Sequence, residues 1–163
     1  MLLLRLTPAR TILYGGLAVG ALDILKPIVF AAFRGVPATR VLQSVASGAL
    51  GRSAYQGGLP AAALGLGFHF FIAFTVFTIY YVANRRLHTL VRHAYVWGPL
   101  YGIAVYFFMQ FVVFPLSAIG SVKHPLPVLV DGILTHIVCV GLPTAILIRE
   151  AARRAVVSSG PNL

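Results

Sequence analysis

Four long apolar stretches constrain this chain more than any other feature of its sequence. They cover residues 11–33, 59–83, 94–117 and 126–148, and each is close to the ~20 residues with which a helix spans ~30 Å of hydrocarbon. Helices are the expected form, because lipid offers no partner for backbone N–H and C=O groups. We therefore predict an all-α integral membrane four-helix bundle, with residues 1–163 forming a single transmembrane domain.

The overall composition supports a lipid surrounding. Of the 163 residues, 59% are hydrophobic and only 10% are charged, whereas soluble domains carry roughly 25% charged residues. The net charge of +10 does not indicate a nucleic-acid partner, because the basic residues stand at the ends of apolar stretches instead of forming a stripe with interleaved aromatics. The expected partner is the lipid bilayer, with no nucleic acid.

The two ends of the chain need separate interpretations. The first apolar stretch resembles a signal peptide, but Asp23 and Lys26 interrupt it and no small-residue cleavage site follows. We expect a retained first helix in which Asp23 and Lys26, three residues apart, pair on one face and offset part of their insertion cost. That cost is ~2.5–3.5 kcal/mol for each charge facing lipid. The tail over residues 155–163 is predicted to be disordered.

The basic residues are unevenly divided between the two sides that four crossings define. One side holds Arg5, Arg10, Arg85, Arg86, Arg92, Arg149, Arg153 and Arg154. The other side holds Arg34, Arg40, Arg52 and Lys123. An excess of Lys and Arg marks cytoplasmic loops, so eight residues against four predict that both termini are cytoplasmic.

The first outer loop carries its own helical pattern. After Pro37, apolar residues recur at a helical spacing; they are Val41, Leu42, Val45, Ala46, Ala49 and Leu50. We predict an outer amphipathic segment after the first helix, either interfacial or re-entrant, that ends at Gly48 or Gly51.

The two halves of the chain share a pattern. The motif L-P-x4-G-x3-H occupies residues 59–69 and returns at residues 126–136. Before it, L-Y-G at 13–15 and at 100–102 is followed by a polar residue eight positions after the glycine, Asp23 in the first copy and Gln110 in the second. Each copy holds two helices, so both insert the same way round. We predict two parallel two-helix repeats related by an axis along the membrane normal.

Six polar residues from the four stretches are predicted to share the outer half of the bilayer. Asp23, His69 and His136 lie about ten residues from the outer ends of their helices, or ~15 Å at about 1.5 Å per residue. Ionisable residues inside a span usually face the bundle interior or a wet cavity. We predict an intramembrane polar site formed by Asp23, Lys26, His69, Gln110, Asp131 and His136.

Glycines at helical spacing indicate where the helices approach closely. Small residues one turn apart let two backbones come together in a membrane. The glycines assigned to helix packing are Gly16, Gly20, Gly65, Gly98, Gly102 and Gly132.

Several functions are compatible with such a site. It could handle a proton, an ion or a small solute, because His titrates near neutral pH and interacts strongly with a carboxylate. His69, His136 and Asp23 are candidate metal ligands, and the two histidines are also candidate haem ligands. In a structural or assembly subunit, by contrast, these residues would only lock helices together, and a homo-oligomer or another membrane protein would be the partner. The sequence has no HExxH, nucleophile elbow or phosphate loop, so an enzyme is less expected than these classes. Asp23 and Asp131 are the candidate acid–base pair of an intramembrane enzyme, although their depths differ by about five residues.

Five segments resemble small bacterial inner-membrane proteins, of which the YagU-like proteins are the nearest named group. They are ASGALGRSAYQGG (46–58), LGLGFHFFIAF (64–74), LYGIAV (100–105), VVFPLS (112–117) and GILTHIVCVGLP (132–143). The resemblance extends from residue 13 to residue 143. It implies a four-helix protein of the bacterial inner membrane, and it implies no activity and no catalytic residue.

Overall fold

A computed structural model describes residues 7–121 and 123–158 of the chain. All its regular elements are helical. In chain order they are α1 (Pro8–Ala32), α2 (Ala38–Leu50), the 3-10 helix η1 (Gly51–Gln56), α3 (Gly58–Arg86), α4 (Thr89–Arg92), α5 (Ala94–Phe108), the π-helical η2 (Met109–Val113), α6 (Phe114–Leu116), α7 (Leu126–Thr135), the π-helical η3 (His136–Gly141) and α8 (Leu142–Ser158).

Four helices are long and apolar enough to cross a membrane. They are α1, α3, the continuous run α5–η2–α6 from Ala94 to Leu116, and the run α7–η3–α8, apolar over Leu126–Arg154. The predicted all-α four-helix fold of a multi-pass membrane protein is confirmed.

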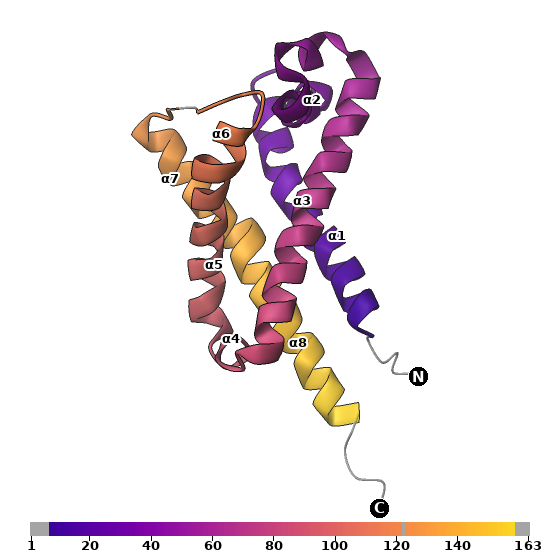
Figure 1. Cartoon of the computed structure of the whole chain (residues 1–163), viewed down its shortest axis with the longest axis vertical. Helices are drawn as coiled ribbons and strands as arrows, with labels where there is room; N and C mark the ends of the chain where they lie inside the picture. Colours follow the sequence, from indigo (N-terminus) through magenta and orange to yellow (C-terminus); the bar gives the residue numbers. More distant parts are fainter. Residues whose placement is uncertain (1–6, 122, 159–163) are drawn as a thin grey trace, which may run out of the picture.

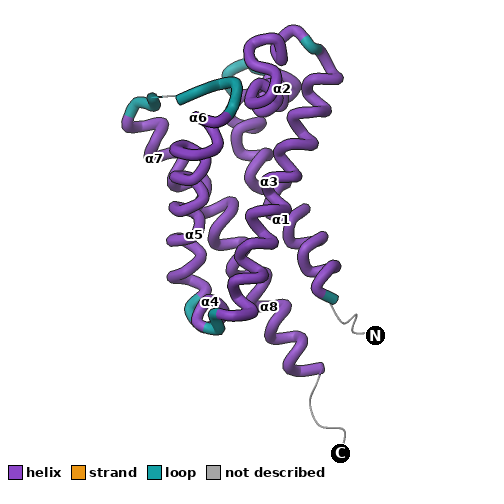
Figure 2. Tube along the Cα trace, viewed as in Figure 1, coloured by secondary structure: helices purple, strands orange, loops and turns teal. Residues whose placement is uncertain are grey.

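The spans are arranged as two packed groups (Figure 1). α1 and α3 pack on each other and α2 packs on α3, whereas α5 packs on η3 and α8. The start of α1, the short α4 and the end of α8 lie at one end of the molecule, and α2 and the connection from α6 to α7 lie at the other. Loops are short (Figure 2), so very little of the described chain lies outside the helices.

Local residue chemistry explains several helix ends. Thr7 caps α1, its hydroxyl accepting a hydrogen bond from the backbone N–H of Arg10 at 3.3 Å, and Pro8 occupies the first turn. The predicted outer segment is the helix α2, which ends at Gly51 and not at Gly48. Gly51 has φ 59°, in the left-handed region where a side chain would be strained.

Each of the two π-helical segments ends two residues before a proline. Pro115 follows η2, and Pro143 follows η3. A proline inside a helix lacks the N–H that would bond the carbonyl four residues earlier, and its ring crowds that carbonyl. Here those carbonyls belong to Phe111 and Cys139, both inside the π-helical segments. The widened turns accommodate this disruption without breaking the span.

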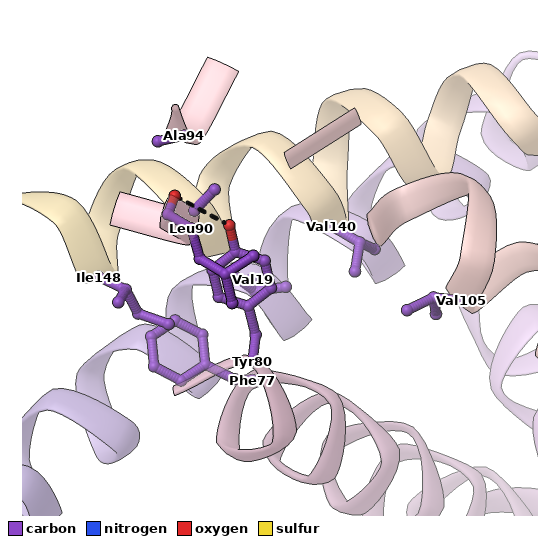
Figure 3. Packing of buried hydrophobic residues seen from close by; sticks show 9 residues of the cluster. Val19, Phe77, Tyr80, Leu90, Ala94, Val105, Val140 and Ile148 are labelled. Carbon is purple, nitrogen blue, oxygen red and sulfur yellow. Dashed lines mark hydrogen bonds between the residues drawn. The ribbon is translucent and has the colours of Figure 1, made fainter. Parts of the chain in front are cut away.

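The main hydrophobic core lies toward the α4 end. Its buried residues come from α1, α3, α4, α5, η3 and α8; they are Val19, Phe77, Tyr80, Leu90, Ala94, Val105, Val140, Ala145 and Ile148. Figure 3 shows these side chains, with the Tyr80 hydroxyl donating to the Leu90 carbonyl at 3.4 Å. The Phe77 ring lies where a side chain on Gly15 would stand.

The last helix is longer than the sequence predicts. The tail was expected to be disordered from residue 155, but α8 continues to Ser158; Ala151 and Ala152 favour helix, and Arg154 bonds Glu150 one turn earlier at 3.0 Å. Residues 159–163 lie outside the described part.

The internal repeat stays a prediction, and both π-helical segments fall in its second copy.

Candidate functional site

A cavity of about 780 Å³ lies among the spans on the side of α2. All six residues of the predicted polar site line it: Asp23, Lys26, His69, Gln110, Asp131 and His136. Ser47 and Gly48 of α2 line its outer part, and Val19, Val105 and Val140 of the core line its inner part. The cavity therefore draws residues from every span and from α2.

The remaining cavity wall is mostly apolar. It includes Phe68, Phe71, Ile72, Met109 and Phe114. Small-molecule sites are typically of ~300–1,000 Å³, mostly apolar, with a few polar groups that orient the ligand. The volume and lining of this cavity fall within that description.

An ion pair joins the first and fourth spans across the cavity. The ammonium of Lys26 on α1 donates to a carboxylate oxygen of Asp131 on α7. The expectation that Lys26 pairs with Asp23 was therefore wrong. Residues three apart on one helix can meet, but here α7 presents a carboxylate that the long lysine side chain reaches instead.

The carboxylate of Asp23 is left without such a partner. This half-buried side chain lines the cavity from α1, and no ion pair or hydrogen bond of its carboxylate occurs among the residues that the structure describes. The sequence contains only three acidic residues. Two of them, Asp23 and Asp131, face this one cavity.

His69 bridges the second and first spans. Its Nε2 lies 2.8 Å from the carbonyl oxygen of Gly20, and the side chain is buried. Because a carbonyl oxygen only accepts, Nε2 carries the hydrogen, and in the neutral ring Nδ1 remains an acceptor. The same α1 glycine leaves room for the Phe70 ring, 2.8 Å from where a Cβ would stand.

His136 and Gln110 are organised around Tyr106. His136 begins η3 and donates from Nδ1 to the carbonyl oxygen of Gly132 at 2.9 Å, and its ring meets the Tyr106 ring edge-on at 5.3 Å between centroids. Gln110, in η2, donates from Nε2 to the Tyr106 hydroxyl at 2.9 Å. The free ring nitrogen of neutral His136 is Nε2, again an acceptor.

Sequence analysis left several polar residues of the cavity out of the predicted site, among them Tyr106 and His124. Tyr106 is buried within α5, and the sequence signal for it was a hydroxyl-bearing aromatic deep in a span, away from the interfacial belt where tyrosine is common. Gly132 provides its space, because a Cβ there would lie 2.5 Å from the ring. His124 precedes α7, outside any predicted span.

The six packing glycines all lie at close contacts. Side chains on Gly65, Gly98 or Gly102 would meet backbone atoms of Leu42, Gly141 or His136, respectively. Gly16, Gly20 and Gly132 instead face the aromatic rings of Phe74, Phe70 and Tyr106.

The structure does not form the candidate metal site. Among the described residues, no group of three His, Cys, Asp or Glu side chains is placed to hold a metal ion. Asp23, His69 and His136 line one cavity but are not gathered around a common point. Haem ligation by the two histidines stays a prediction, and a Soret band lost in a His69→Ala, His136→Ala double variant would establish it.

The hydrogen bond of His69 gives a first testable prediction. His69→Phe keeps a ring of similar size but removes the bond to the Gly20 carbonyl, so the free energy of unfolding should fall by about 0.6–2 kcal/mol. His69→Gln keeps a donor and should lose less. The free energies of unfolding of both variants are measured by denaturant titration in mixed micelles. Equal losses of stability in His69→Phe and His69→Gln would show that the hydrogen bond contributes nothing beyond packing.

Comparisons of the chain with protein-family models, curated proteins and solved structures found no match. The resemblance to YagU-like proteins is therefore neither supported nor contradicted.

Proposed function

We propose that this membrane protein binds a small, largely apolar organic solute in the cavity among its spans. The observation that supports this is the gathering of the six predicted site residues, which come from all four spans, around one cavity of about 780 Å³. Each ionisable residue in a span carries an insertion cost, and such residues usually face a functional cavity.

Among the solutes considered, an organic molecule fits this lining better than a bare ion. A hard cation needs about six or more oxygen ligands at close range, whereas the wall here is mainly aliphatic and aromatic. A proton needs no volume at all. The apolar wall suits the body of a solute, and the polar residues suit one hydrogen-bonding group on it.

A structural or assembly subunit is the second candidate, and specific contacts favour it. The Lys26–Asp131 pair and the His69–Gly20 hydrogen bond both join different spans, as expected if polar residues only lock helices. These contacts leave Asp23 and one nitrogen of each histidine unengaged, and the helix-locking role does not account for them.

Photolabelling with an apolar aryl diazirine tests solute binding. In lipid nanodiscs, cavity residues such as Phe68 and Tyr106 should be labelled saturably, and labelling should fall when unlabelled 1-adamantanol is added. Ile72→Trp, which fills the cavity wall, should suppress this labelling. Ile79→Trp is the matched control, because Ile79 lies on the same helix with 56% of its surface exposed and outside the cavity.

The possible outcomes separate the two candidates. Saturable labelling that only Ile72→Trp removes supports a binding cavity. Labelling that is unsaturable and equal in both variants, confined to lipid-facing residues, would overturn the proposal and leave the structural role. Thermal unfolding of both variants is measured in parallel, so that misfolding of Ile72→Trp is recognised.

We also propose a bacterial inner-membrane location with both termini in the cytoplasm. The basic residues Arg85, Arg86 and Arg92 lie around α4, the end of the molecule that also holds the start of α1 and the end of α8. A green fluorescent protein fused to the C-terminus should therefore fluoresce in bacterial cells, and alkaline phosphatase fused there should be inactive. An active phosphatase fusion would reverse the assigned orientation.

A further inference from the structure

We infer that the solute is an organic cation, a protonated amine on a compact apolar body, whose charge is balanced by Asp23. This inference rests on the proposed function and specifies the chemical class of its ligand. Three features of the cavity lining support it, namely the net charge, the free hydrogen-bond acceptors and the aromatic rings.

The charge of the cavity is negative by one unit with its histidines neutral. The charged side chains that line it are Asp23, Lys26 and Asp131, and no arginine does. Lys26 and Asp131 neutralise each other in their ion pair. The carboxylate of Asp23 remains. An ionised carboxylate in mostly apolar surroundings is costly unless a positive charge accompanies it. Lys26 is already paired with Asp131, and no ion pair to Asp23 occurs among the described residues.

The hydrogen bonds already made inside the protein leave several acceptors free around Asp23. The N–H groups of His69 and His136 are donated to backbone carbonyls, and one N–H of Gln110 is donated to Tyr106. Acceptors remain on the Asp23 carboxylate, on the second nitrogen of each neutral histidine and on the Gln110 carbonyl oxygen, beside the hydroxyl hydrogen of Tyr106 and the second N–H of Gln110 as donors. A ligand that carries donors, as an ammonium does, complements this set.

The rest of the lining suits the remainder of such a ligand. Phe68, Phe71 and Tyr106 contribute aromatic rings, which attract cations through their electron-rich faces, and aliphatic side chains surround them. A neutral apolar solute would leave the Asp23 charge unbalanced, and an anion would place a second negative charge beside it. An organic cation satisfies the charge, the acceptors and the apolar wall together.

Three probes that share one cage test this inference: 1-adamantylammonium, 1-adamantanol and adamantane-1-carboxylate. They differ chiefly in charge. Binding is measured by calorimetry at neutral pH, where the amine is protonated. The protein is held in nanodiscs of zwitterionic lipid, so that membrane charge does not attract the cation, and the heats from empty nanodiscs are subtracted.

Two carboxylate variants make the matched comparison. Asp23→Asn removes the proposed counter-charge, and Glu150→Gln removes the one acidic residue that does not line the cavity. Both change the protein's net charge equally. Asp23→Glu restores the charge. Thermal unfolding of each variant reports whether it is folded.

In the wild-type protein the ammonium should bind about tenfold or more tightly than the alcohol, and the carboxylate should bind least. Glu150→Gln should keep that order, and Asp23→Glu should keep most of the preference for the ammonium. Asp23→Asn should bring the affinities for the ammonium and the alcohol to within about twofold of each other.

The outcomes distinguish a failure of this inference from a failure of the proposed function. If all three probes bind equally and Ile72→Trp blocks them, the cavity binds solutes but the inference of a cation is wrong. A preference for the ammonium that survives in folded Asp23→Asn would also overturn it. If no probe binds the wild-type protein above empty nanodiscs and the diazirine labelling is unsaturable, the proposed function itself fails.

Discussion

Gly65→Ala is expected to destabilise the fold strongly. A methyl group at this position of α3 would collide with the carbonyl group of Leu42 on α2, and backbone cannot rotate away as a side chain can. Inserting a carbon into such a contact costs about 1–3 kcal/mol. Because α2 lines the outer part of the cavity, its displacement should also weaken solute binding.

Gly67→Ala on the same helix is the control. No atom lies within 4 Å of a Cβ built there, so this change should be neutral or stabilising, by up to ~1 kcal/mol from reduced chain entropy. The two free energies of unfolding, measured by denaturant titration in the same micelles, should differ by about 1–4 kcal/mol. Equal values would mean that α2 does not pack on α3 as described.

Lys26→Met should produce the second large effect. The change removes the only Lys or Arg side chain that lines the cavity among the described residues, and it leaves Asp131 without its ion-pair partner in a cavity that also holds Asp23. An unpaired charge inside a span costs ~2.5–3.5 kcal/mol at the centre. The Asp131 side chain is 60% exposed in the isolated chain, so a loss of about 2 kcal/mol is expected.

A double-mutant cycle isolates the contribution of the pair. Adding Asp131→Asn to Lys26→Met removes the orphaned carboxylate and should restore most of the lost stability. The exposed pair of Arg154 and Glu150 at the end of α8 is the reference, and breaking it should cost no more than ~0.5 kcal/mol. A cycle with no coupling between Lys26 and Asp131 would remove the ion pair from the description of the site.

The amino-acid sequence alone was sufficient to predict the number of spans and their approximate limits. A stretch of about twenty apolar residues has one stable form in lipid, because its backbone polar groups must bond within the helix. The same local logic identified α2 from its apolar spacing. It also singled out the six polar residues around the cavity, since charged and amide side chains are rare inside spans.

Tertiary structure decided how those residues are connected. The spacing in the sequence allowed Asp23 and Lys26 to pair. In the tertiary structure α7 instead brings Asp131 within reach of Lys26, and these two residues form the ion pair. Asp23 then has no ion-pair partner among the described residues. The packing of Tyr106 against His136 also depends on a contact between spans. Helix formation is local and can be deduced from order along the chain, whereas charge pairing and cavity shape depend on which faces of separate helices meet.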